Sequence, residues 1–246
     1  MSALSRLTAT ETKLFFREPM LVFFVLAFPP ILLVILGAIP AMREPSEDLG
    51  GARAISLYVP IIVALGLALF ALNGLSQLFA TYREKGVLRR MRTTPVEPRV
   101  MIGAQLLMST IMSVATMVVV LAIGRLAFDV SLPRQLPAYL IGYLLAALAM
   151  FTIGLLVASL APNGKSAGAI GTLLFFPLAF FAGLWVPRAE MNDVLRTISD
   201  FTPLGAGVQS LQDATAGHWP QPLHAAVLLG WTIVAGGLAA RYFRWE

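Results

Sequence analysis

The chain has 246 residues, of which 58% are hydrophobic and only 13% are charged, whereas soluble domains carry about 25% charged residues. This composition excludes a water-soluble globular protein, and the absence of cysteine excludes disulfides, thiolate metal sites and cysteine nucleophiles. The net charge of +5 could suggest nucleic acid, but it also fits the basic cytoplasmic loops of a membrane protein.

Residues 1–19 predict an amphipathic helix that lies in the headgroup plane before the first membrane span. Leu4, Leu7, Leu14 and Phe15 recur at helical spacing among charged residues. A frayed polar tail is the alternative, but it would leave these apolar side chains in water. No small-residue cleavage site follows the first apolar run, so we expect that span to be retained rather than removed as a signal peptide.

Six apolar runs are each long enough to cross a bilayer, which takes about 20 helical residues. They cover residues 20–42, 54–82, 100–124, 135–163, 166–187 and 215–240. The predicted fold is therefore an all-α integral membrane protein with six transmembrane helices in a single domain over residues 1–246. Six spans leave no room for a nucleotide-hydrolysing domain in these residues, so we expect the energy for any transport to come from another chain or from an ion gradient.

Residues 82–99, between the second and third runs, hold six basic and two acidic residues. Gly86 is expected to break the helix, and Leu88 and Met91 form a short apolar stripe that Pro95 and Pro98 end. A short amphipathic helix of this kind suits docking into a partner's groove on the cytoplasmic face. The alternative is contact with anionic lipid headgroups, worth about 1 kcal/mol for each basic residue.

The link between the fifth and sixth runs, residues 187–222, predicts two short helices outside the membrane. Its first part has apolar residues at helical spacing, namely Met191, Val194, Leu195, Ile198 and Phe201. Thr202 followed by Pro203 then predicts the N-cap and first position of a second helix. A plain surface hairpin is the alternative.

The positive-inside rule places both termini in the cytoplasm. This orientation puts twelve of the eighteen basic residues and five of the thirteen acidic residues inside, a net charge of +7, and leaves −2 outside. The predicted location is therefore a multi-pass protein of the plasma membrane, with residues 82–99 inside and residues 187–222 outside.

Several uncharged polar side chains and aromatic rings in the spans are candidates for lining a substrate path. The candidates are Phe70, Asn73 and Gln77 in the second span, Gln105 in the third, and Phe176 and Phe180 in the fifth. The polar groups could instead form hydrogen bonds between helices, worth about 0.6 kcal/mol per contact. The phenylalanines could instead serve only in packing. A path without fixed charge suits a hydrophobic or amphipathic solute, such as a drug or a lipid-like molecule.

Other kinds of site find little support in the sequence. The span centres hold no Asp, Glu, Lys or Arg, which argues against a proton-driven pump. The stretch SLAPNGKS (159–166) lacks the first glycine of a phosphate-binding loop and has no strand before it. His218 and His224 are expected to be solvated near an interface, and no carboxylate pair has metal-ligand spacing, so we predict no catalytic residues, metal or cofactor in this chain.

The stretch YREKGVLRRMRTTPV (82–96) resembles the signature of membrane subunits of type-2 ABC exporters, the family that includes daunorubicin-exporter permeases. The glycine comes directly after Glu84-Lys85 here, which departs slightly from the commonest spacing. The resemblance extends over the whole chain, including the N-terminal helix, the six spans and the two external helices.

This resemblance implies a permease that works as a homo- or heterodimer with a separate ATPase subunit and exports drugs or other hydrophobic solutes. ATP and Mg would then bind the partner chain, and residues 82–99 would be the coupling helix that touches it. The implied coupling positions are Glu84, Gly86, Leu88, Arg89, Arg90, Thr94 and Pro95. A gradient-driven carrier or channel and a non-transport membrane assembly protein are the alternative functions.

Overall fold

The computed structural model describes residues 3–49, 51–87 and 98–242, and these residues form helices apart from one isolated bridge between Pro45 and Arg53. Six helical segments are long and apolar enough to cross a membrane: Pro19–Ala38, Ala54–Glu84, Val100–Phe128, Leu136–Leu160, Gly164–Phe181 and Pro222–Tyr242. The predicted all-helical fold with six candidate spans is therefore confirmed, and we number the spans one to six.

Two spans are continuous helices with a wide π turn inside them. Span one consists of α2 (Pro19–Val22), η1 (Phe23–Ala27) and α3 (Phe28–Ala38), and span two of α5 (Ala54–Leu69), η3 (Phe70–Leu75) and α6 (Ser76–Glu84). The other spans are single helices, α8 (Pro98–Phe128), α9 (Leu136–Leu160), α10 (Gly164–Phe181) and α13 (Pro222–Tyr242). Short helices complete the chain: α1 (Ala3–Phe15), α4 (Pro40–Arg43), η2 (Glu47–Leu49), η4 (Arg188–Glu190), α11 (Asp193–Phe201) and α12 (Pro203–Ala216).

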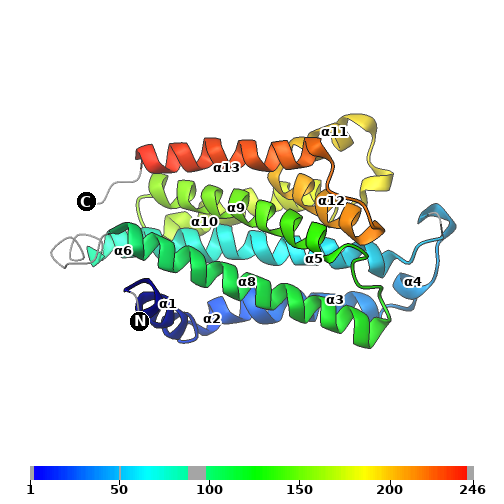
Figure 1. Cartoon of the computed structure of the whole chain (residues 1–246), viewed down its shortest axis with the longest axis horizontal. Coiled ribbons are helices and arrows are strands. Elements are labelled where there is room, and N and C mark those ends of the chain that lie inside the picture. The colour runs from blue at the N-terminus through cyan, green and yellow to red at the C-terminus, as the bar shows by residue number, and fades with distance from the viewer. Residues whose placement is uncertain (1–2, 50, 88–97, 243–246) are drawn as a thin grey trace.

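Span two is the central helix of the bundle. In Figure 1, α5 runs between α3 and α8 on one side and α9, α10 and α13 on the other. Its residues from Val59 to Ala68 are all buried, whereas the other spans each leave apolar side chains exposed. Such exposed apolar side chains suit a lipid surround, so hydrophobic packing around span two forms the core of the bundle.

The two ends of the bundle carry different short elements. In Figure 1, α1, the end of α6 and the end of α13 lie at one end, and α4, α11 and α12 lie at the other. By the charge rule above, the first end would face the cytoplasm.

The prolines of span one are accommodated by a neighbouring helix. Pro29 lacks an amide hydrogen, so it leaves the carbonyl of Val25 without its helical donor. The Thr116 hydroxyl of α8 lies 3.0 Å from that carbonyl and donates to it. This contact supports the interpretation of the polar residues in span three as interhelical donors.

The N-terminal residues form a helix, α1, but part of its expected membrane face packs inward. Thr8, Glu11 and Phe15 are buried, and the Phe15 ring lies 5.8 Å from the Phe70 ring of span two. Leu4 and Leu14 remain exposed. The helix is therefore held to the bundle by one face and leaves apolar side chains free on another.

Several span boundaries differ from the apolar runs, and two of these differences have a clear local cause. Span one ends at Ala38 rather than residue 42, because Ile39 is extended and Pro40 begins the separate helix α4. Span six begins at Pro222 rather than residue 215, because α12 continues to Ala216 and ends at Gly217, which has a φ of 98°. Apolar composition alone does not reveal these breaks, since the apolar runs continue across them.

Candidate functional site

The end of span two, at α6, contains the described part of the predicted coupling segment. Gly86 has a φ of 65°, in the left-handed region, and its amide donates to the carbonyl of Arg83 at 3.0 Å. The helix therefore ends where the glycine was expected to break it. The predicted coupling residues Leu88, Arg89, Arg90, Thr94 and Pro95 lie outside the described residues.

Arg83 turns inward and binds the end of α9. Its guanidinium donates to the carbonyls of Ala158 and Ser159 at 3.0 Å each, and also to the carbonyl of Ala161. The last carbonyls of a helix have no partner within the helix, so a guanidinium with several donors satisfies them well. The sequence showed Arg83 only as one of the basic residues of 82–99, for which a partner or lipid headgroups were the expected contacts, because backbone acceptors far along the chain leave no pattern in the sequence.

Glu84 binds the beginning of α10. Its carboxylate oxygen Oε2 accepts a hydrogen bond from the amide of Gly164 at 3.2 Å. Asn163 caps the same helix, since its side chain accepts from the amide of Ser166 at 2.8 Å. Arg83 and Glu84 thus hold the two sides of the turn between α9 and α10, here called the α9–α10 turn (residues 161–163).

Glu11 connects the N-terminal helix to the same end of span two. The Tyr82 hydroxyl donates to its carboxylate at 3.0 Å. Burial raises the pKa of Glu11 above its ordinary value, although the hydrogen bond from Tyr82 acts in the opposite direction. Helix α1, the end of α6 and the α9–α10 turn are therefore linked by side-chain contacts.

The predicted path residues Asn73 and Gln77 lie together on an uncovered face of the bundle. The Thr172 hydroxyl of α10 lies 2.9 Å from the Asn73 side-chain oxygen and donates to it. Gln77 is exposed and its amide lies beside Gly168 of α10. Phe176, one helical turn beyond Thr172, is 55% exposed and stacks on Trp185 with ring centroids 6.0 Å apart. We call Asn73, Gln77, Gly168, Thr172 and Phe176 the two–five face.

The remaining path candidates lie elsewhere. Phe70 is buried between Phe15 and Phe151, and Gln105 is 1% exposed with no hydrogen-bond partner for its amide among the described residues. Phe180 is half-buried beside Phe181. Phe70 thus does not share the exposed face of Gln77, and the π turn η3 between them changes the angular spacing of the residues after Phe70.

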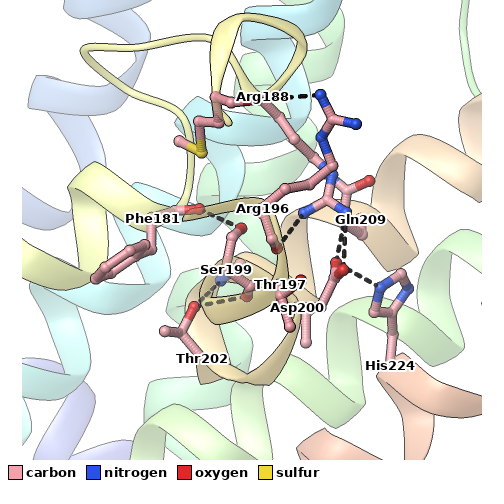
Figure 2. Close-up of polar contacts among 12 residues, drawn as sticks. Phe181, Arg188, Arg196, Thr197, Ser199, Asp200, Thr202, Gln209 and His224 are labelled. Carbon is pink, nitrogen blue, oxygen red and sulfur yellow. Dashed lines mark hydrogen bonds and ion pairs between the residues drawn. The ribbon is translucent and has the colours of Figure 1, made fainter. Parts of the chain in front are cut away.

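The opposite end of the bundle is held together by an ionic cluster centred on Asp200 (Figure 2). Arg188 lies 2.7 Å from one carboxylate oxygen, and His224 Nε2 lies 3.1 Å from the same oxygen. His224 is 3% exposed, so the expectation that it is solvated is wrong. Burial opposes ionisation of Asp200, but the hydrogen bonds and charges of Arg188 and His224 outweigh it and lower the pKa of the carboxyl.

Further contacts fasten α11 to the spans. The Ser199 hydroxyl donates to the carbonyl of Phe181 at 2.6 Å, and the Trp231 indole donates to the carbonyl of Phe201 at 2.9 Å. Thr202 caps α12 as predicted, since its side chain accepts from the amide of Gly205. Beside them, a cavity of about 530 Å³ is lined by apolar residues of α5 and by Arg188, Arg196, Gln209 and Gln212.

The described residues contain no group of three or more His, Asp or Glu side chains placed to hold a metal. The stretch 159–166 is helical on both sides of the α9–α10 turn, and Ser159 itself lies in α9. A phosphate-binding loop follows a strand, so this arrangement does not support a nucleotide site there.

Comparison with known proteins agrees with this architecture. Residues 2–215 match the family described as ABC-2 type transporter. The chain is also 25% identical over 141 residues to a protein of Bacillus subtilis (strain 168) named "Putative transport permease YvfS". That alignment covers 56% of this chain and 57% of the relative, so the chain matches little more than half of the relative's length. With the family match extending over most of its residues, this multi-pass membrane protein belongs to the ABC-2 type transporter family.

Proposed function

We propose that the chain is the membrane subunit of an ATP-driven exporter in the plasma membrane. Together with a second permease subunit it forms the path for a hydrophobic or amphipathic solute, and a separate ATPase subunit supplies the energy. Family membership supports this proposal, because ABC-2 permeases normally work with an ATPase. The charge asymmetry supports an orientation with both termini and residues 82–99 in the cytoplasm.

The uncovered two–five face is the observation that carries the proposal. Asn73, Gln77 and Thr172 lie within spans two and five, yet this chain leaves Gln77 and Thr172 exposed. Polar side chains in a membrane are placed toward other helices or a water-filled path rather than toward lipid. A second copy facing this surface would cover the polar groups and enclose a path between the two chains.

The chemistry of this face favours the proposed class of solute. Amide and hydroxyl groups lie at Asn73, Gln77 and Thr172, and the aromatic pair of Phe176 and Trp185 follows along α10. None of these side chains is charged. A solute with a large apolar body and a few polar groups would therefore find both aromatic contacts and hydrogen bonds.

Single-cysteine crosslinking tests the location of the path. The chain has no cysteine, so Gln77→Cys would place one thiol on the two–five face of each copy. We expect oxidation in membranes to give a disulfide-linked dimer, and we expect Ile233→Cys, which is 72% exposed on α13, to give none. Dimers from Ile233→Cys and none from Gln77→Cys would contradict the proposed arrangement.

The partner is tested by purification under native conditions. We expect the chain to co-purify with a nucleotide-hydrolysing protein, and we expect the ATPase activity to disappear when that protein is removed. ATP hydrolysis by the chain alone would contradict the proposal.

A further inference from the structure

We propose that Arg83 and Glu84 are positioning residues. They transmit a movement of the predicted coupling segment, at the end of span two, to span five. The inference rests on the proposed function, since it concerns how a movement imposed at the end of span two reaches the two–five face. It also assigns these side chains a role within the chain rather than a contact with the ATPase.

The two residues are adjacent in sequence and hold opposite sides of one turn. Arg83 donates to the carbonyls of Ala158, Ser159 and Ala161 at the end of α9. Glu84 accepts from the amide of Gly164 at the start of α10. A displacement of the α6 end would therefore act on the end of span four and on the beginning of span five together.

The close approach of Thr81 to Gly164 makes this joint tight. A Cβ atom placed on Gly164 would collide with the Thr81 hydroxyl of α6. Helices α6 and α10 therefore touch at this point without an intervening side chain of residue 164. Gly86, in its left-handed conformation, ends α6 two residues after Glu84, so the joint lies immediately before the segment proposed to contact the ATPase.

Span five carries the movement to the path. Gly164 and Thr172 lie on the same continuous helix, about 12 Å apart at a rise of 1.5 Å per residue. A shift at the α9–α10 turn would thus change the position of Thr172 relative to Asn73.

The geometry predicts an unusual pattern among conservative variants. Glu84 acts by accepting from a backbone amide, so Glu84→Gln keeps the necessary oxygen and Glu84→Ala removes it. Arg83 reaches three carbonyls with one planar group, which the single ammonium of Arg83→Lys cannot reproduce. A contact with charged residues of the ATPase would give the reverse order, because Arg83→Lys keeps its charge and Glu84→Gln loses it.

The test measures ATP hydrolysis and ATP-driven transport in the purified complex of the permease with its ATPase. We expect Glu84→Ala and Arg83→Lys to lower transport per ATP hydrolysed by about tenfold or more, the scale of losing a hydrogen bond to a charged group. Glu84→Gln should stay close to the unmodified complex. Lys165→Gln is the matched control, because Lys165 is exposed beside the same turn and should not affect coupling.

A second readout separates transmission from loss of stability. Leu173→Cys, 74% exposed on α10, would be the only thiol of the chain, and its labelling rate should change when nucleotide is added. Arg83→Lys in the same background should abolish that change while hydrolysis continues. Full coupling in Arg83→Lys, or equal losses in Glu84→Gln and Glu84→Ala, would overturn the inference. Absence of ATP-driven transport in the unmodified complex would instead refute the proposed function.

Discussion

Close backbone approach to two glycines fixes the position of span two at the scale of single residues. A Cβ on Gly154 would collide with the carbonyl of Ala71, and one on Gly171 would collide with the carbonyl of Leu72. Both carbonyls belong to the π turn η3, which thus packs directly against α9 and α10. The glycines are required by the lack of space and not by their own dihedral angles.

Gly171→Ala should therefore destabilise the bundle. The obstacle is a backbone carbonyl that cannot rotate away, so the helices must separate, at a cost of about 1–3 kcal/mol. Thermal unfolding in detergent measures the effect. Gly237→Ala is the control, because no atom lies within 4 Å of its added Cβ, and it should unfold at or above the temperature of the unmodified protein. Equal stability of the two variants would contradict this account of η3.

Local capping could be predicted from the sequence, whereas long-range backbone contacts could not. Thr202 and Pro203 identify the start of α12 because a capping side chain and a proline act on adjacent residues. The contacts of Arg83 and His224 could not be predicted because their partners are distant, at Ala158 and Asp200 respectively. Nothing near either residue in the sequence indicates those partners.

At the scale of elements, Asp200 joins the short helices η4 and α11 to the spans. It binds Arg188 of η4 and His224 of α13, while its own helix, α11, is attached to α10 through Ser199. The Asp200 side chain is 19% exposed, so these charges are partly removed from water. This cluster holds α11 in one position relative to spans five and six.

Asp200→Asn should lower the melting temperature of the protein. The change removes the counter-charge of Arg188 and His224, and losing a hydrogen bond to a charged group costs about 1.5–3 kcal/mol. Asp193→Asn is the matched control in the same helix, because its carboxylate is 99% exposed and lies 3.6 Å from Arg196. Ion pairs this exposed to water contribute little to the stability of the folded protein. A melting temperature lowered equally by both variants would contradict the role given to Asp200.

Because the pKa of Asp200 is lowered, the contribution of this cluster to stability depends on pH. The carboxyl has a pKa below its ordinary value of 3.8, so the folded state favours the ionised form. Its contribution to stability is complete at pH values above 3.8 and is lost as the pH falls through the lowered pKa. The stability difference between the unmodified protein and Asp200→Asn should therefore shrink under acid conditions.

The number and type of elements followed from the apolar runs, but the faces of span two did not. Six runs of sufficient length predict six spans because the bilayer requires apolar helices of that length. The face shared by Asn73 and Thr172 depends on η3, and that π turn contains no proline that would indicate it. Phe70, named with Asn73 and Gln77 as a path candidate, is therefore buried in the bundle instead.

At the scale of the whole molecule, three regions of side-chain contacts lie along the bundle. The contacts of Arg83 and Glu84 connect span two to span five at one end, the two–five face lies along the middle, and the Asp200 cluster fixes the other end. A movement that begins beside Gly86 can reach Thr172 through helices that are already in contact. The proposed division of labour assigns ATP hydrolysis to the partner and solute passage to the dimer of permease subunits.

ATP-dependent transport in reconstituted vesicles tests the central claim most directly. Vesicles would contain the purified chain either alone or with its co-purifying ATPase, and a fluorescent amphipathic solute would be followed across the membrane. We predict transport only when the ATPase and ATP are both present, with no response to an imposed proton or sodium gradient. Gradient-driven transport by the chain alone would contradict the account.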